Sequence, residues 1–288
     1  MVCESQNRCS TLIVILLLKL NTIFFCFAFL TSSVHYKAQC AAQSNAFKSG
    51  EQLNFSVVYN WGMVWLESAS ASFKVKSTSV NNKPCFIFTG SGSTYPKYDW
   101  FFKVRDMFET TVDSASFRPL KFKADISEGN KNDHHTYVFD LFKQRVYTIV
   151  TRGKKKASVD TLDFRPCNVD VLSAIYYARN IDYSQYAIND TINISVLLDG
   201  AVYPLYIRYL GKEVYTSPLF GKYNCIKFRP LLVEGSIFRA GEHMTVWVTD
   251  DKNKVPLYVE TEILVGKIKV SLSSMSGLKF PLDSKVPN

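Results

Sequence analysis

Carboxylates are the residues of this 288-residue chain with the clearest potential for catalysis. Glu51, Asp106, Asp250 and Asp251 each lie at the end of a strand-like run or within one. Two carboxyl groups roughly 5 to 10 Å apart are sufficient for glycoside hydrolysis, so a pair of these acids would allow an enzyme that acts on glycans. Acids in turns usually cap their own backbone amides, and this interpretation is favoured for the DDKNK segment at 250–254.

The histidines and serines do not form a catalytic or metal-binding motif. His134 and His135 are adjacent, and neighbouring side chains of a strand point to opposite faces, so a regular strand cannot direct both at one metal ion. The chain has no G-x-S-x-G segment. Counted from Asp250, Val255 and Thr261 stand where an EF-hand calcium loop requires Gly and Glu. We therefore predict no catalytic residue, no metal site and no cofactor.

Aromatic residues are the candidates for ligand binding. The chain has 21 Phe and 16 Tyr against 13 Gly, a composition that favours strands. On a strongly curved sheet, one aromatic face would suit an acyl chain or a stacked sugar. The predicted residues of this concave face are Phe55, Tyr59, Trp61, Trp65 and Trp247. The alternative is that these side chains simply fill the core.

Arg105 and Asp106 are the candidate polar contacts of the same ligand. They lie among large aromatic residues, Phe101, Phe102 and Phe108, on a predicted strand. The arginine would attract the charged head group of an amphiphile. The alternative is a buried ion pair with a purely structural role.

The first forty residues are predicted to be a signal peptide. Residues 11–30 are apolar, but Lys19 near their centre would cost about 3 kcal/mol in a membrane-spanning helix. Arg8 and Lys19 precede a short apolar run that is followed by small residues, as in a secretory signal. Removal of residues 1–40 is therefore expected. The alternatives are a retained N-terminal anchor helix and lipid modification of Cys40.

The chain is basic, with a formal net charge of +9 at pH 7. Its one dense basic run is Lys154, Lys155 and Lys156, which is interpreted as a solvated hairpin tip. For an exported protein, anionic lipid head groups or acidic polysaccharides suit this charge better than nucleic acid does. No nucleic-acid partner is predicted, and membrane contact is expected only through export or an N-terminal anchor.

Three cysteines follow the predicted signal peptide: Cys85, Cys167 and Cys225. They form no C-x-x-C motif and have no metal-ligand spacing. Buried free thiols are the favoured prediction, although two of the three could pair in an oxidising compartment.

Alternation of apolar and polar residues predicts a mainly β protein. From Leu53 to Trp61, apolar residues occupy every second position, and 65–76 continues the pattern after a turn at Gly62 and Met63. Residues 90–100 are predicted to form a loop. Further short strand-like runs lie at 85–89, 103–112, 117–126, 136–142, 145–152, 157–164, 191–198, 202–209, 214–215, 223–228, 244–249, 256–264 and 267–272.

Residues 168–180 break this alternation. Their apolar positions recur with a period of 3.6, which predicts one short helix capped by Asn168 or Asp170. Asp199–Gly200 predicts a tight hairpin turn after it. The expected fold is an antiparallel meander that forms a strongly curved sheet or half-open barrel. Residues 41–288 are expected to form a single β domain, with the helix near an internal division.

Several segments resemble a known family. They are FKSGEQLNF at 47–55, VRD at 104–106, RPL at 118–120, DVLSA at 170–174 and VWVTDD at 246–251. Over residues 46–275 the chain is similar to the exported bacterial proteins grouped as domain-of-unknown-function family 3108. The resemblance implies export, commonly in the Bacteroidetes, and an antiparallel β fold without assigned catalytic residues. The general shape of this family is similar to that of periplasmic half-barrels such as the LolA and LolB carriers, and this comparison is an analogy of fold alone.

These observations predict a protein of the periplasm or cell envelope. Its expected function is the non-catalytic binding or carrying of an apolar or amphiphilic ligand, such as a lipid. The alternatives are a glycan-acting enzyme with a carboxylate pair and an interaction module of an envelope complex.

Overall fold

The computed structural model describes residues 46–234 and 239–287, and only the backbone of Trp61. These residues belong to one compact unit of the chain, Gln39–Asn288. The predicted signal peptide and Cys40 lie outside the described residues. Among those described, no helix has both the length and the apolar character needed to cross a membrane.

Strands make up most of the described chain. In chain order they are β1 (Gln52–Trp61), β2 (Val64–Val80), β3 (Lys83–Thr94), β4 (Arg105–Asp113), β5 (Pro119–Glu128), β6 (Lys131–Asp140), β7 (Arg145–Arg152), β8 (Ser158–Asp163), β9 (Asn168–Asp170), β10 (Thr191–Leu198), β11 (Ala201–Ser217), β12 (Gly221–Pro230), β13 (Met244–Thr249), β14 (Pro256–Glu262) and β15 (Lys267–Ser276). The helices are η1 (Pro96–Tyr98), α2 (Val171–Asn180) and η2 (Tyr183–Gln185).

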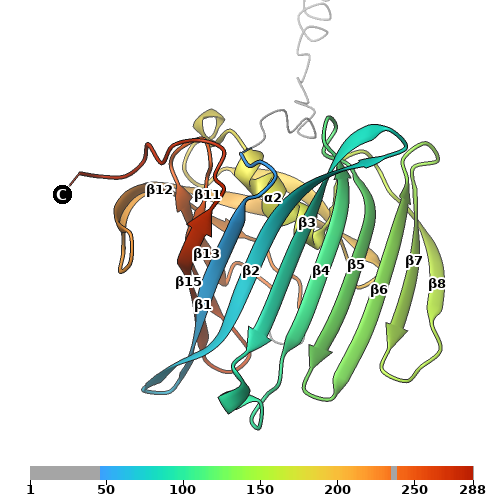
Figure 1. The fold of residues 1–288 in the computed structure, drawn as a ribbon, viewed down its shortest axis with the longest axis horizontal. Helices are drawn as coiled ribbons and strands as arrows, with labels where there is room; N and C mark the ends of the chain where they lie inside the picture. The colour runs from blue at the N-terminus through green and yellow to red at the C-terminus, as the bar shows by residue number, and fades with distance from the viewer. Residues whose placement is uncertain (1–45, 235–238, 288) are drawn as a thin grey trace, which may run out of the picture. The chain divides into compact units, whose positions relative to one another are not determined.

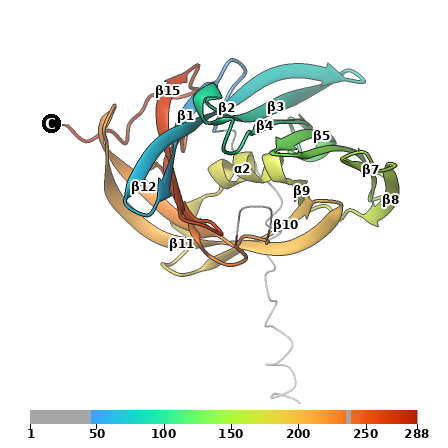
Figure 2. The ribbon, with the colours of Figure 1, turned by 90° about the horizontal axis from the view of Figure 1, so that it is seen from below.

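The fifteen strands form one sheet, whose order is β8-β7-β6-β5-β4-β3-β2-β1-β15-β14-β13-β12-β11-β10-β9. All neighbours are antiparallel except β9 and β10, which are parallel. Figure 2 shows that the sheet curls around α2, while β8 and β9 remain its two separate edges. The predicted curved, half-open antiparallel sheet is therefore confirmed.

The predicted helix is confirmed, but it begins three residues late because 168–170 pair with β10 as strand β9. Asp170 caps the helix, since its carboxylate accepts hydrogen bonds from the Ser173 amide at 2.9 Å and from the Ser173 hydroxyl at 2.6 Å. Thr110 of β4 donates a third bond to the same carboxylate at 2.8 Å. The cap therefore also fixes α2 against the inner face of the sheet.

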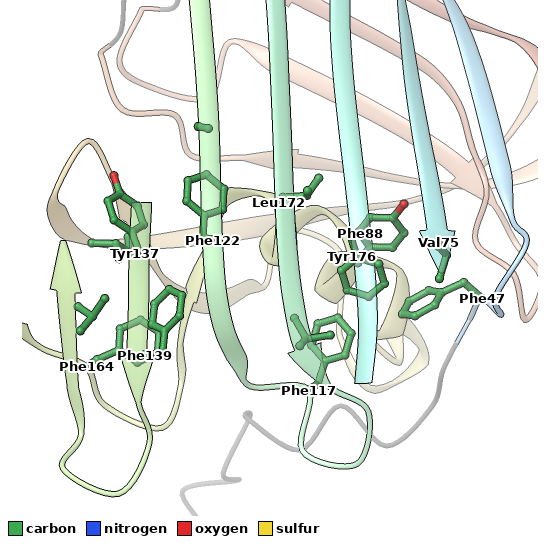
Figure 3. Close-up of a cluster of buried hydrophobic side chains, with 14 of the residues drawn as sticks. Phe47, Val75, Phe88, Phe117, Phe122, Tyr137, Phe139, Phe164, Leu172 and Tyr176 are labelled. Carbon is green, nitrogen blue, oxygen red and sulfur yellow. The ribbon is translucent and has the colours of Figure 1, made fainter. Parts of the chain in front are cut away.

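The aromatic surplus of the sequence fills the core. In Figure 3, Phe47, Phe88 and Tyr176 lie together between α2 and the sheet. The rings of Phe88 and Tyr176 stack with their centres 3.9 Å apart, and Phe47 meets both edge-on. The cluster continues across the sheet through other buried aromatic residues, which are Phe117, Phe122, Tyr137, Phe139 and Phe164.

A β-bulge in β2 changes which residues face the core. Val57 of β1 pairs with Ala69, but the next residue, Val58, pairs with Glu67, so Ser68 is an extra residue in β2. A bulge of this kind reverses the facing of all residues beyond it. Trp65 therefore lies on the face opposite to Ala69, although simple alternation predicts that the two share a face.

Two strands extend further than the sequence pattern predicts. The loop expected at 90–100 begins only at Tyr95, because β3 continues to Thr94. The runs at 202–209 and 214–215 belong to one long strand, β11, which has a bulge between Tyr209 and Lys212. The Asp199–Gly200 turn is confirmed between β10 and β11, where both residues have positive φ.

Candidate functional site

Three neighbouring turns at one end of the sheet expose large apolar side chains. They are the β1–β2 turn with the first residues of β2 (62–65), the β3–β4 loop (95–104) and the β14–β15 turn (263–266). We call these three segments the loop rim. Because successive strands are antiparallel, all three lie at the same end of the sheet, where Figure 1 shows the β1–β2 and β3–β4 connections at the lower edge.

The loop rim carries a disproportionate share of the exposed apolar residues. Eight of the nineteen large hydrophobic side chains that are exposed among the described residues belong to it. The most exposed are Met63 at 98%, Trp100 at 82% and Val265 at 62%. The others are Val64, Trp65, Phe101, Phe102 and Leu264. Exposed apolar side chains gathered in one place indicate a contact surface, whereas single scattered ones do not.

The β1–β2 and β14–β15 turns are packed against each other. Gly266 has φ +86°, and a Cβ there would lie 2.2 Å from the carbonyl oxygen of Asn60. The hydroxyl of Tyr59 donates to the carbonyl oxygen of Val265 at 3.0 Å. Lys269 of β15 places its Nζ 4.2 Å from the ring centre of Trp65. These contacts hold Val265 beside the β1–β2 turn.

The β3–β4 loop is fixed by a polar network at its base. Asp99 forms a salt bridge with Arg105 at 2.7 Å and accepts a hydrogen bond from the Thr94 hydroxyl at 2.8 Å. Arg105 also donates to the carbonyl oxygen of Thr94 at 3.0 Å. The ordered base leaves Trp100 and Phe101 exposed, with their ring centres 6.0 Å apart.

Arg105 therefore stabilises the loop and does not form the buried ion pair with Asp106 that was considered as the structural alternative. The half-buried carboxylate of Asp106 accepts a hydrogen bond from the Ser127 amide at 3.0 Å. Burial raises the pKa of Asp106 to about 6, the Ser127 amide partly offsets this rise, and the nearby Glu128 adds to it.

The predicted aromatic residues do not share one concave face. Ser56 of β1 pairs with Ser271 of β15, which pairs with Tyr258, which in turn pairs with Trp247. Residues that pair directly across strands lie on the same face, so Trp247 shares the face of Ser56. Phe55, the neighbour of Ser56, points to the opposite face. The predicted single aromatic lining is therefore wrong.

Each of these aromatic residues has its own surroundings. Phe55 is buried and packs edge-on against Phe73, so it belongs to the core. Tyr59 is half-buried and shares the face of Phe55. Trp247 donates a hydrogen bond to Glu213 and packs against Tyr258, with ring centres 5.2 Å apart. The side chain of Trp61 lies outside the described part of the structure.

A shallow polar groove of about 270 Å³ crosses β1, β2 and β3 on the face of Ser56. Glu67 is its one carboxylate and accepts a hydrogen bond from the hydroxyl of Tyr95 at 2.9 Å. The hydroxyl oxygen of Ser72 is buried there without a partner among the described residues. The other groove residues are Asn54, Phe55, Ser56, Ser70, Ala71, Ser91, Ser93 and Ser273.

The four predicted acids serve structural roles. Glu51 is buried and forms a salt bridge with Arg179. Asp250 pairs with Lys212 at 2.8 Å, and Asp251 caps its own turn as predicted, accepting hydrogen bonds from the amides of residues 253 and 254. Asp106 is the second residue of β4 and lies at the other end of the sheet. These contacts give no support to a catalytic carboxylate pair.

The histidines point to opposite faces of β6, as predicted. His134 is exposed and contacts Asp125 at 2.6 Å, whereas His135 is buried and forms a hydrogen bond with Tyr137 at 3.2 Å. No group of three or more His, Cys, Asp or Glu residues within the described ranges could hold a metal ion.

The predicted buried thiols are confirmed for Cys85 and Cys225, which are free. The prediction is wrong for Cys167, which is disulfide-bonded. Its partner is not among the described residues, and the sequence pattern gave no motif that would identify the bond.

The sequence pattern did not identify the loop rim. Its signal was present, because WGMVW, DWFF and LVG each place large apolar residues at or beside a turn, where polar residues are usual. Met63 and Trp100 are predicted to lie in a turn and a loop, but the sequence alone does not show that these segments lie side by side.

Comparison with solved structures finds similarity to a "Beta-barrel-like Protein of Domain of Unknown Function DUF1849" from Brucella abortus. The TM-score is 0.49 at 8% identity, and the match covers 80% of this chain and 98% of that one. No curated protein matches the sequence. The model of the family described as "Protein of unknown function (DUF3108)" matches residues 54–273, most of the sheet, and the chain therefore belongs to this family.

Proposed function

We propose that this chain is an exported envelope protein that binds amphiphilic lipids through the loop rim without transforming them. The observation that carries the proposal is the exposure of Met63, Trp100, Phe101 and Val265 in three neighbouring turns at one end of the sheet. Trp side chains combine an apolar body with a polar N–H group and are enriched where membranes meet water. A rim of this kind suits the interface between acyl chains and head groups.

One observation supports export. The N-terminal segment has the layout of a secretory signal.

Non-catalytic binding is favoured because the rim offers apolar contact area and few reactive groups. The one acid within the β3–β4 loop, Asp99, is held by Arg105 and Thr94. The contact between the other two turns and the polar network at the base of this loop would present the side chains without a large rearrangement, which lowers the entropic cost of binding.

Quenching of tryptophan fluorescence by brominated phosphatidylcholine vesicles tests the proposal with the full chain. Residues 1–45 contain no tryptophan, so the signal comes from the β unit even where the N-terminal segment touches lipid. Trp65 and Trp100 lie in the rim, so we expect quenching. Absence of quenching at any lipid concentration would overturn the proposal.

A double variant, Met63→Ser with Phe101→Ser, tests whether the rim makes the contact. It removes two exposed apolar side chains from two different turns and leaves every tryptophan in place. Half-maximal quenching should then need about tenfold to a hundredfold more lipid. The matched control is Leu219→Ser with Phe142→Ser, two exposed residues in turns at the opposite end of the sheet. Equal losses in both double variants would contradict a specific role of the rim.

The polar groove favours a second candidate, the non-catalytic binding of a glycan. Its lining is rich in hydroxyl groups, and Trp65 lies on the same face of the sheet. Glu67 is the one carboxylate of the groove, whereas two-acid hydrolysis requires a pair. Calorimetric titration with maltohexaose and cellohexaose tests this candidate. Ser70→Val should abolish the binding heat, whereas Ser79→Val, near the other end of β2, should not.

A further inference from the structure

We propose that the β7–β8 hairpin forms a head-group site for anionic lipids beside the loop rim, so that the two dock together on an anionic bilayer. This inference rests on the proposed function, because it assigns the lipid class that the rim meets. The observation that supports it is the position of Lys154, Lys155 and Lys156 in a turn at the same end of the sheet as the loop rim.

The hairpin connects strands that run in the same sense as those of the rim turns. The β1–β2, β3–β4, β5–β6 and β7–β8 connections follow one another at the same end of the sheet, which is its lower end in Figure 1. Adjacent strands are about 4.8 Å apart, so the lysine hairpin lies roughly 15 Å along the edge from the β3–β4 loop. This spacing corresponds to a few lipid head groups.

Direct contacts join the loop rim to the lysine hairpin through the β5–β6 turn. A Cβ on Gly129 would lie 3.1 Å from the ring of Phe102, and the Gly129 amide donates to the carbonyl oxygen of Lys103 at 2.7 Å. On the other side, the Gly153 amide donates to the carbonyl oxygen of Asn132 at 2.7 Å. The β5–β6 turn therefore contacts the loop rim on one side and the lysine hairpin on the other.

Gly153 and the buried Asp133 shape the base of the hairpin. Gly153 has φ +56°, and its amide also contacts a carboxylate oxygen of Asp133 at 3.1 Å. Asp133 forms its ion pair with Lys131 at 3.4 Å, which leaves the three hairpin lysines outside this interaction. All three are exposed, and no described acidic side chain forms an ion pair with them.

The charge of the hairpin is complementary to an anionic bilayer. Arg152, Lys154, Lys155 and Lys156 follow one another without an acidic residue between them. A basic side chain near an anionic membrane surface contributes about 1 kcal/mol of attraction, so three lysines correspond to an affinity change on the order of 100-fold at low salt. The exposed apolar side chains beside the lysines favour a lipid surface over a dissolved polyanion. A bilayer has an apolar interior into which Trp100 and Met63 can insert, whereas a dissolved polyanion has none.

The test compares two kinds of brominated vesicle, phosphatidylcholine alone and an equal mixture of phosphatidylcholine and phosphatidylglycerol, using the full chain. We expect half-maximal tryptophan quenching at far lower lipid concentration with the mixture, and loss of this preference at high salt. The triple variant Lys154→Gln, Lys155→Gln, Lys156→Gln should need on the order of 100-fold more of the mixed lipid and respond to phosphatidylcholine as the unchanged chain does.

A charge-matched control is Lys48→Gln, Lys76→Gln, Lys83→Gln, three exposed lysines at the opposite end of the sheet. It should keep the preference for the mixture. If the hairpin variant keeps the preference, the head-group site is wrong while rim binding stands. If neither vesicle quenches tryptophan, the proposed function fails and this inference fails with it. If the hairpin variant loses binding to dissolved heparin but keeps its preference for the mixed vesicles, the site is for a soluble polyanion and the inference is wrong.

Discussion

Arg179 and Glu51 form a buried bidentate salt bridge across 128 residues of sequence, with Nη1–Oε1 at 2.5 Å and Nη2–Oε2 at 2.9 Å. Arg179 also donates to the carbonyl oxygen of Asn253 at 2.9 Å. One guanidinium group therefore joins the last turn of α2, the residue before β1 and the β13–β14 turn. This relationship explains why an acid considered for catalysis has a structural role.

We expect Glu51→Gln to destabilise the protein by about 3–5 kcal/mol, because it leaves the buried Arg179 charge without a counter-ion. Urea denaturation followed by circular dichroism measures the change. Asp163→Asn is the control, since its partner Arg145 and Asp163 itself are both largely exposed, and such pairs contribute little. A loss below 1 kcal/mol for Glu51→Gln would show that the buried pair is not needed for stability.

Gly266→Ala should destabilise the protein by roughly 1–3 kcal/mol, because the new Cβ would meet the carbonyl oxygen of Asn60 in a backbone region that disfavours side chains. Thermal unfolding measures this effect. Gly92→Ala provides the comparison, since its φ is not in the left-handed region and a Cβ there meets no atom within 4 Å. Equal stability of the two variants would mean that the contact between the β1–β2 and β14–β15 turns is loose.

Asp106 should make stability depend on pH. Its pKa is about 6 in the folded protein against an ordinary 3.8, so the folded state holds the proton more tightly. The contribution of Asp106 to stability is therefore greatest below pH 4, falls as the pH rises from about 4 to 6, and then stays low. Asp106→Asn, whose amide oxygen can still accept from Ser127, should gain about 1–2 kcal/mol at pH 7.5 and nothing at pH 4. Urea denaturation of both proteins between pH 4 and pH 7.5 measures the difference in the free energy of unfolding. A difference that does not change with pH would contradict the role of Asp106.

The free thiols should be inert while the protein is folded. Burial raises the pKa of Cys225 to about 12 and also raises the pKa of Cys85. Iodoacetamide at pH 8, with labelled sites mapped by mass spectrometry, should modify both only after unfolding. A cysteine introduced by Phe142→Cys supplies an exposed reference and should react at least about 100-fold faster. Comparable rates at Cys225 and residue 142 would contradict the buried environment.

Local patterning determined the secondary structure of this protein. Alternation with period two predicted most strands, and the 3.6-residue stripe at 168–180 predicted α2, because both periods depend only on neighbouring residues. The same pattern predicted that Asp251 caps its own turn and that His134 and His135 face opposite ways. Alternation and the turn signals also predicted the antiparallel meander, with which the family resemblance agrees.

Tertiary structure alone decided which side chains share a surface. One extra residue in β2, Ser68, moves Trp65 to the other face of the sheet. Strand register likewise places Trp247 and Phe55 on opposite faces. The position of a bulge depends on cross-strand pairing, which a single strand's sequence does not contain. The loop rim and the Glu51–Arg179 pair likewise unite segments far apart in the chain. The sequence by itself thus determined the strands, the helix and their chemistry, whereas the gathering of Met63, Trp100 and Val265 required the folded sheet.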